Sequence, residues 1–196
     1  MSGHGLDTSG GARSCRDVYE QMAELTAGGA VVRNFHADIR MDDFVVETDL
    51  FPVAALDVYS AWNLDLPVSD ADRATYFSAH RGGGQGDYRQ GMRAKVANVV
   101  DALTRFPASK RAVVSVVPRP DAPHTSDDDA KCLREVHFHL DDGVLGATVL
   151  MRAQAAEIFP KNIHYVGALM AEVASRLGVR VGNLHYLATV LVSDRW

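Results

Sequence analysis

The chain of 196 residues is long enough to bury one sizeable hydrophobic core and short for two domains. Its formal net charge of -5 excludes a general electrostatic attraction to nucleic acid or to anionic membranes. No apolar run approaches the roughly 18 residues that span a bilayer, and the N-terminal stretch lacks the apolar core of a secretory signal. We therefore expect a cytoplasmic protein without nucleic-acid or membrane partners, in which Cys15 and Cys132 stay reduced.

The N-terminal stretch differs in composition from the rest of the chain. Residues 1–14 are rich in glycine and serine, which predicts a flexible arm ahead of a single domain over residues 15–196. Cys15 stands at the loose end of this arm, and a short amphipathic helix is expected from there to Leu25. Alternating apolar residues then predict a strand within residues 30–46.

Three helices and a strand are expected in the middle of the chain. Residues 51–62 have a proline at their second position and apolar side chains on one side. A short helix is expected over residues 67–77. Residues 92–106 carry apolar side chains at intervals of three and four, the clearest helical period of the first half. Pro107 ends that helix, and the valine-rich residues 111–117 predict a buried strand.

A predicted hairpin organises the C-terminal half. The alternation of apolar and polar residues after Cys132 predicts a strand with one buried face, and residues 141–143 predict a turn. Residues 145–151 are apolar and partly β-branched, so they predict the returning strand. That strand runs out at Arg152. A thiol and a guanidinium therefore mark the open end of the hairpin.

A second long helix follows the hairpin. It is expected over residues 163–177, with Asn162 opening it and Gly178 ending it. A last apolar strand is expected over residues 184–192. Because strands and helices do not alternate regularly, we expect an α+β fold rather than a doubly wound sheet. In such a fold the thiol, the guanidinium and the Asn162 amide could converge on one cleft.

Three sets of side chains are candidates for chemistry. Cys132 becomes a nucleophile if nearby cations lower its pKa, and an ordinary half-buried cysteine is the alternative. His137 and His139 share a strand face, as a metal-binding pair would. No third ligand follows at a telling distance, so we expect structural or substrate-contacting histidines and no metal. Lys110 and Arg111 form either a solvated pair or a clamp for an anion.

Residues 88–186 present a series of motifs in a distinctive order. The motifs are YRQGMR at residues 88–93, a helix, PASKR at residues 107–111, a strand, Cys132 followed by His137 and Phe138, an Asp142-Gly143 turn, Arg152, and Asn162 at the start of a helix. Their order and spacing resemble those of the thymidylate synthase and pyrimidine hydroxymethylase superfamily. The resemblance implies a thymidylate synthase-like α+β fold. A mixed sheet would pack with two long helices and form the interface of a homodimer.

The resemblance also implies a role for each matching residue. Cys132 corresponds to the nucleophile that adds to C6 of a pyrimidine nucleotide, and His137 stands where the family has a catalytic-site glutamine. The implied substrate-binding residues are Tyr88, Arg152 for the phosphate and the thiol, Lys110 and Arg111 for the phosphate of the partner's nucleotide, and Asn162 for N3–H and O4 of uracil. The implied one-carbon donor is 5,10-methylene-tetrahydrofolate. The expected activity is transfer of a methyl or hydroxymethyl group to C5 of the ring.

The chain also departs from the family pattern. Ala153 and Ala155 stand where the family has a serine and an aspartate, and Val192 and Asp194 stand where it has a sugar-binding histidine and tyrosine. No counterpart of the general-acid glutamate is found near Trp62. These departures favour a specialised biosynthetic pathway and a pyrimidine nucleotide or a related ring as substrate. Two alternatives remain: the same fold with another reaction on a non-nucleotide substrate, and a non-catalytic binding or partner protein.

Overall fold

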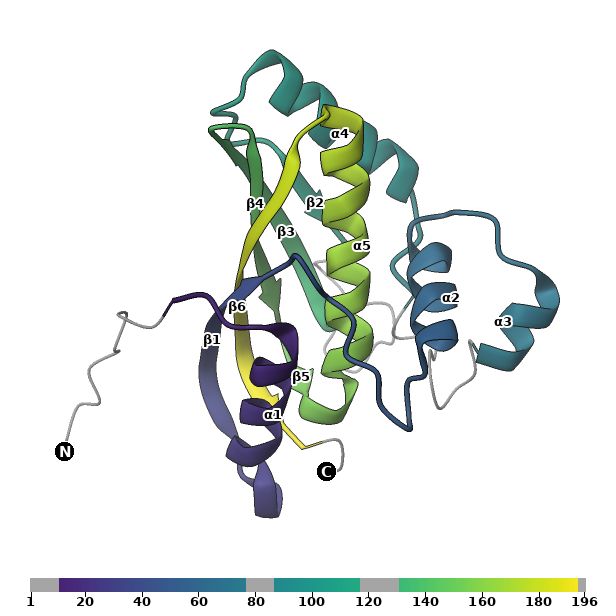
Figure 1. Cartoon of the computed structure of the whole chain (residues 1–196), viewed down its shortest axis with the longest axis vertical. Coiled ribbons are helices and arrows are strands. Elements are labelled where there is room, and N and C mark those ends of the chain that lie inside the picture. Colours follow the sequence, from purple (N-terminus) through teal and green to yellow (C-terminus); the bar gives the residue numbers. More distant parts are fainter. Residues whose placement is uncertain (1–10, 77–86, 117–130, 194–196) are drawn as a thin grey trace, which may run out of the picture.

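The fold of the computed structural model, which describes residues 11–76, 87–116 and 131–193, is α+β, as the sequence predicts (Figure 1). A mixed six-stranded sheet packs against helices. The strands are β1 (Val32–Arg40), β2 (Val113–Ser115), β3 (Leu133–Asp141), β4 (Val144–Met151), β5 (Gln154–Ala155) and β6 (Arg180–Val192). The helices are α1 (Cys15–Leu25), α2 (Val53–Asn63), α3 (Asp70–Tyr76), α4 (Met92–Arg105) and α5 (Phe159–Leu177), with short 3₁₀ turns η1 (Ala27–Gly29) and η4 (Ala156–Ile158).

The sheet has the strand order β1-β6-β4-β3-β2, with β5 also paired to β6. The β1–β6, β2–β3 and β3–β4 pairs are antiparallel, whereas β6 runs parallel to both β4 and β5. The parallel pairing of β4 with β6 requires a crossover, which η4 and α5 supply. This crossover lays α5 along the sheet, where it buries most of its residues against the core.

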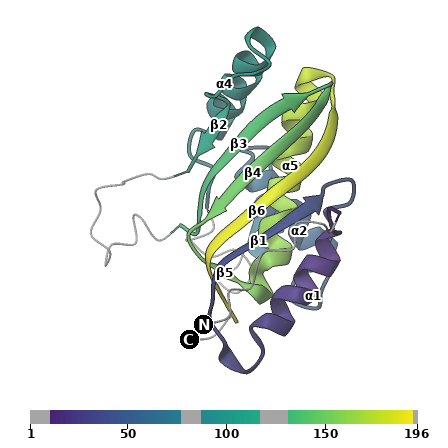
Figure 2. The same ribbon diagram turned by 90° about the vertical axis from the view of Figure 1, so that its left-hand side faces the viewer.

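One face of the sheet is left open by the helices that the structure describes (Figure 2). Its strands alternate between side chains buried under the helices and side chains turned to this face. On it, His137 lies opposite Thr148, which lies opposite His185, which in turn lies opposite Asp38. The side chains of His137, His185 and Asp38 each have more than half of their surface exposed to solvent. The open face is therefore polar and rich in histidine.

Helix α5 begins earlier than the sequence analysis predicts. It starts at Phe159, with Pro160 in its first turn, where the missing N–H of proline costs no hydrogen bond. Asn162 consequently lies inside the first turn instead of ahead of the helix. The predicted end is confirmed, because Gly178 adopts a left-handed conformation with φ of 68°.

The other predicted elements differ from the observed ones mainly in their ends. The helices expected over residues 51–62, 67–77 and 92–106 correspond to α2, α3 and α4, although residue 77 lies outside the described part. The strand expected over residues 111–117 is shorter, and residue 117 is not described. The last strand is longer than predicted, because pairing of Val144 with Arg180 extends β6 into residues that are not apolar.

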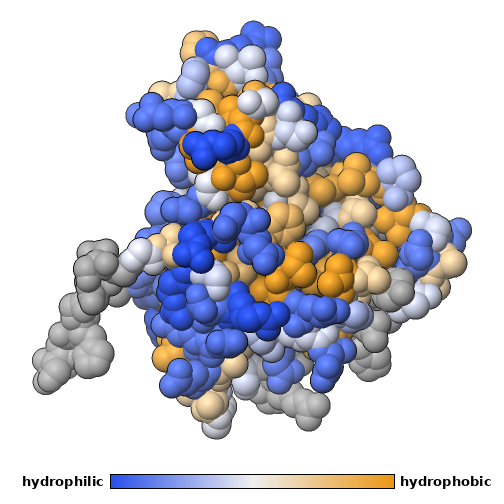
Figure 3. All heavy atoms as spheres, viewed as in Figure 1, coloured by the Kyte–Doolittle hydropathy of each residue, from blue (hydrophilic) through white to orange (hydrophobic). Residues whose placement is uncertain are grey.

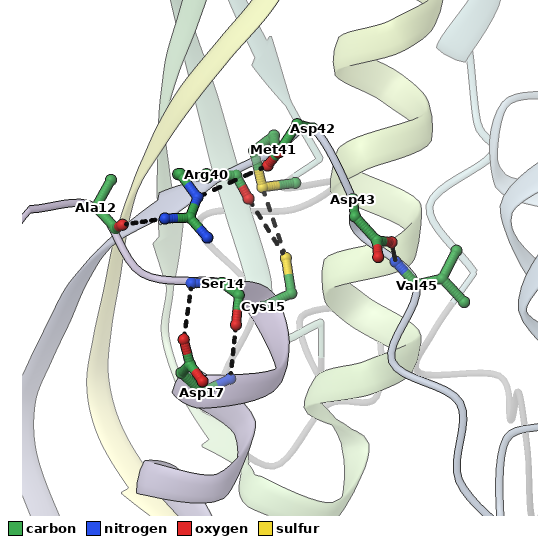
Figure 4. A network of polar contacts seen from close by, with 9 residues as sticks. All are labelled: Ala12, Ser14, Cys15, Asp17, Arg40, Met41, Asp42, Asp43 and Val45. Atoms are coloured by element: carbon green, nitrogen blue, oxygen red, sulfur yellow. Dashed lines mark hydrogen bonds and ion pairs between the residues drawn. The ribbon is translucent and has the colours of Figure 1, made fainter.

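Cys15 is not at the end of a loose arm (Figure 4). Arg13 pairs with Ile39 of β1, and Ser14 caps α1 by accepting a hydrogen bond from the backbone N–H of Asp17 at 3.1 Å. Cys15 follows directly and is only 1% exposed. Residues 13 and 14 are thus tied to the domain, whereas residues 1–10 of the expected arm lie outside the described residues.

Among the described residues, none of the helices combines the length and the apolar composition needed to cross a bilayer. Both cysteines are free thiols, as expected from the sequence.

Candidate functional site

The open end of the β3–β4 hairpin brings Cys132 to Arg152. Leu133 pairs with Met151 across the two strands, so the residue before β3 and the residue after β4 are neighbours. The backbone N–H of Arg152 donates to the carbonyl oxygen of Cys132 at 2.7 Å. Cys132 is half-buried and Arg152 is exposed. The hairpin register alone therefore joins two residues that are twenty positions apart in the sequence.

Tyr88 lies beside this pair, with only 3% of its surface exposed. Burial raises the pKa of its phenol, and negative charge on Cys132 raises that pKa further, while the positive charge of Arg152 lowers it. The backbone of Leu133 hydrogen-bonds the phenol as well. Because the charges of Cys132 and Arg152 both affect the pKa of Tyr88, both side chains lie close to the phenol. Tyr88 is a neutral phenol at physiological pH and can donate a hydrogen bond.

Residues of α2 and α5 fix the position of Tyr88. The backbone N–H of Tyr88 donates to the side-chain oxygen of Asn63 at 2.6 Å. The ring stacks on Tyr165, with centroids 5.5 Å apart and an interplanar angle of 24°. The ammonium of Lys131 lies 5.7 Å from the centroid of the Tyr88 ring. The sequence reasoning missed Asn63 and Tyr165, whose only signal is their place within predicted helices.

Asn162 belongs to a buried polar network at the same end of the sheet. Its side-chain N–H donates to the side-chain oxygen of Gln154 at 3.0 Å. The hydroxyl of Tyr186 donates to that same oxygen at 2.6 Å. Negative charge on Cys132 contributes to raising the pKa of Tyr186, after burial as the main cause. Gln154 therefore connects Asn162 to the tyrosine that adjoins Cys132.

Gln154 was not a candidate from the sequence, because the Ala-Gln-Ala run after Arg152 was interpreted as a loss of family residues. It is only 1% exposed. A long polar residue at the end of a buried strand needs hydrogen-bond partners, and that rule is the signal that could have identified it.

Cations surround this cluster. Lys161, in the first turn of α5, is only 7% exposed, and its ammonium lies 4.7 Å from the centroid of the Tyr59 ring. Such a position over a ring face stabilises a buried cation. Lys131 and Arg152 add two more positive charges near Tyr88. These cations could pair with an anionic ligand that lies beside Cys132.

The two cysteines differ sharply in their surroundings. The thiol of Cys15 packs against the carbonyl oxygen of Arg40 and the sulfur of Met41, each at 3.9 Å (Figure 4). Burial raises the pKa of Cys15 to about 12, and the negative charges of Asp43 and Asp42 raise it as well. Cys15 is therefore a protonated core thiol at neutral pH. Of the two, Cys132 is the candidate nucleophile.

His137 is not brought to Cys132 within the chain. It lies on the open face of the sheet, where its Nε2 is 2.8 Å from a carboxylate oxygen of Glu135. Cys132 lies five positions earlier along the extended chain, which corresponds to roughly 16 Å. His139 is on the same face, with Nε2 3.7 Å from Asp141. Within the described residues, no group of three or more potential ligands lies close enough to hold a metal ion.

Lys110 and Arg111 are also distant from Cys132 in the same chain. Both are exposed in the turn between α4 and β2. The carbonyl oxygen of the next residue, Ala112, accepts from the backbone N–H of Phe138 at 2.8 Å. Because Phe138 is six residues along β3 from Cys132, the separation is roughly 20 Å. The structure thus brings together Tyr88, Cys132, Arg152 and Asn162, and places the other expected site residues elsewhere.

Comparison with known proteins does not extend this description. No model of a known protein family matches the chain, and no curated protein matches it at a significant level.

Proposed function

We propose that the protein is a thymidylate synthase-like transferase that adds a one-carbon unit, methyl or hydroxymethyl, to C5 of a pyrimidine nucleotide or a related ring. The observation that carries the proposal is the meeting of Tyr88, Cys132 and Arg152, which come from three separate motifs. Their order resembles that of the superfamily, and the fold is α+β with a mixed sheet. A specialised biosynthetic pathway is the proposed setting.

Each residue of the cluster has a role in this reaction. The thiolate of Cys132 adds to C6 of the ring, which makes C5 nucleophilic. Arg152 and Lys131 stabilise the thiolate and the charge of a phosphate. The Tyr88 phenol donates a hydrogen bond. Gln154 orients the Asn162 amide, whose carbonyl oxygen and second N–H then recognise N3–H and O4 of a uracil ring.

The donor implied by the resemblance is 5,10-methylene-tetrahydrofolate, an anionic cofactor that would supply a carbon atom at the oxidation level of formaldehyde. A hydroxymethyl product would need no redox change, whereas a methyl product would need a hydride from the tetrahydrofolate, which would leave as dihydrofolate. Groups suited to such a molecule lie next to Tyr88. The indole of Trp62 has the guanidinium of Arg89 4.0 Å from its centroid and that of Arg73 at 4.9 Å. The two guanidinium groups could pair with the carboxylates of such a cofactor.

A homodimer would complete the phosphate site. The open sheet face is the proposed interface, and Lys110 and Arg111 are exposed far from Cys132 of the same chain. A second copy packed across this face in the opposite sense could bring its Lys110 and Arg111 to the first copy's nucleotide. The proposal therefore predicts that each complete site contains residues from two chains.

The covalent step is tested by intact-protein mass spectrometry after incubation with 5-fluoro-dUMP and methylene-tetrahydrofolate. We expect a stable adduct that carries both molecules, and its complete loss in Cys132→Ala. Cys15→Ala is the matched control and should form the adduct normally, because Cys15 is a core thiol. Absence of the adduct in the unaltered protein, or its persistence in Cys132→Ala, would exclude this chemistry at Cys132.

The dimeric site is tested by mixing two inactive variants. Cys132→Ala and a Lys110→Ala, Arg111→Ala double variant should each fail to form the adduct. Mixed dimers should recover it, because one of their two sites has both the thiol and the cation pair. If the double variant forms the adduct unaided, Lys110 and Arg111 have no part in phosphate binding.

A further inference from the structure

A groove between α2 and α5 contains none of the residues of the Cys132 cluster. Its volume is about 520 Å³, inside the range of about 300–1,000 Å³ typical of small-molecule sites. Ser60 and His164 lie at its floor, and each directly adjoins a tyrosine of the cluster in the sequence. The groove is thus a separate site built on the same two helices.

Ser60, His164 and Asp57 lie in a row at the groove, and the first two are joined by a hydrogen bond. The Ser60 hydroxyl and Nδ1 of His164 are 2.8 Å apart, and both residues are less than 5% exposed. Nε2 of His164 lies 3.6 Å from a carboxylate oxygen of Asp57. If the hydroxyl donates to Nδ1, the imidazole hydrogen is on Nε2 and points toward Asp57.

This row of polar side chains suits ligand binding better than acyl transfer. A serine nucleophile requires backbone or side-chain donors aimed at the oxyanion that develops on the substrate. Ser60 lies inside α2, where the backbone N–H groups around it are used in helical hydrogen bonds. The arrangement therefore lacks the geometry for oxyanion stabilisation at Ser60, and its role is to fix the imidazole.

Two acidic residues line the groove, Asp57 and Glu172. Among the residues that the structure describes, no lysine or arginine belongs to this lining. Glu172 is paired with Arg176, at 2.7 Å. Burial lowers the pKa of His164, against the opposing effect of Asp57, so the imidazole is neutral at physiological pH. Asp57, with 66% of its side chain exposed, therefore gives the groove its negative end.

The walls are apolar and partly open to solvent. Phe44 meets the His164 ring edge-on, with centroids 5.2 Å apart. Leu66 and Val45 also line the groove and are 42% and 37% exposed, unusually open for large apolar residues. Apolar surface gathers in this middle part of the molecule in Figure 3. Exposed apolar surface next to polar groups is typical of binding sites.

We propose that this groove binds a hydrophobic amine, with the ammonium at Asp57 beside His164 and the apolar body against Phe44, Leu66 and Val45. The negative end excludes anionic ligands, and the apolar walls exclude small hydrated cations. The inference goes beyond the proposed function and shares no residue with it, so either can fail without the other.

The test uses three probes of equal length: 4-phenylbutylamine, 4-phenylbutanol and 4-phenylbutyrate. Binding is followed by amide chemical shifts in two-dimensional NMR spectra. We expect the amine to bind about 1.4- to five-fold more tightly than the alcohol, because an exposed ion pair contributes roughly 0.2–1 kcal/mol. The carboxylate should bind most weakly. The shifts should map to α2 and α5 residues of the groove.

Two surface variants separate the charge from the apolar contact. Asp57→Asn should remove the preference for the amine over the alcohol, whereas Asp101→Asn, on the exposed side of α4, should retain it. Leu66→Ser should weaken the binding of the amine and the binding of the alcohol by the same factor. Equal affinities of the unaltered protein for amine and alcohol, shifts outside the groove, or an unchanged preference in Asp57→Asn would each overturn the proposal. Asp57, Asp101 and Leu66 are all exposed, so the fold should persist in each variant.

Discussion

Neighbouring residues of α2 and α5 face two very different environments. Tyr59 and Tyr165 pack edge-to-face, 6.3 Å apart, inside the closed cluster next to Tyr88. Ser60 and His164, one position away on each helix, meet at the floor of an open groove. Burial raises the pKa of both tyrosines, whereas the same burial keeps His164 neutral. One helix pair can therefore support a closed polar cluster and an open apolar site together.

The closed side should depend most on Gln154. Replacing it by alanine removes the acceptor for Asn162 and Tyr186 and leaves a cavity. Unpaired buried groups cost about 1–3 kcal/mol each and the cavity adds to this. We expect the free energy of unfolding to fall by about 3 kcal/mol, as measured by urea denaturation.

Gln154→Met separates the two causes. Methionine has a similar shape and fills the cavity, but it lacks a strong acceptor for Asn162 and Tyr186. The free energy of unfolding of Gln154→Met should therefore fall by most of the amount expected for Gln154→Ala. If both variants lose less than about 1 kcal/mol, the network does not stabilise the closed side to the extent that hydrogen-bond energetics predict.

On the open side, Gly167 allows Phe44 to cross α5 closely. A Cβ atom added at Gly167 would lie 2.2 Å from Cγ of Phe44, so the ring would have to move. Overpacking of this kind costs about 1–3 kcal/mol. Gly167→Ala should therefore destabilise the protein in urea denaturation, by less than Gln154→Ala. A second substitution, Phe44→Leu, should recover part of the loss; no recovery would mean that the strain lies elsewhere.

The smallest expected effect is the pH dependence that His164, in the groove, gives to the free energy of unfolding. The pKa of His164 is lowered from its ordinary value of 6.5 when the protein folds. As pH falls through that value, His164 binds a proton in the unfolded chain more readily than in the folded protein. The contribution of His164 to the free energy of unfolding is therefore complete above this pH and is lost below it. Between pH 7 and 5.5, His164→Gln should show a flatter dependence of the unfolding free energy. Identical slopes for both proteins would show that His164 does not contribute.

The order of motifs in the sequence selected Tyr88, Cys132 and Arg152 as candidates, and the structure places them near one another. Hairpin register closes the distance between Cys132 and Arg152 in any fold that forms the hairpin. The α+β class also follows from the local patterns. These predictions rest on neighbours in the sequence or in adjacent strands.

The rest depends on packing that local patterns do not encode. Ser60 and His164 are 104 positions apart, and each was only one more residue of a predicted helix. The alternation around His137 correctly indicates two faces of a strand. The alternation does not predict which of the two faces adjoins Cys132. In the structure His137 lies on the open face of the sheet.

The parallel pairing of β4 with β6 has an electrostatic consequence. It obliges α5, which has Lys161 in its first turn, to start at the end of the sheet where β4 ends and to run back along the sheet. The positive end of the α5 macrodipole, equivalent to about half an elementary charge, therefore lies at the Cys132 end of the molecule. This contribution comes from aligned peptide groups, so no side-chain substitution can delete it. The topology therefore fixes a partial positive charge at that end, whichever side chains surround it.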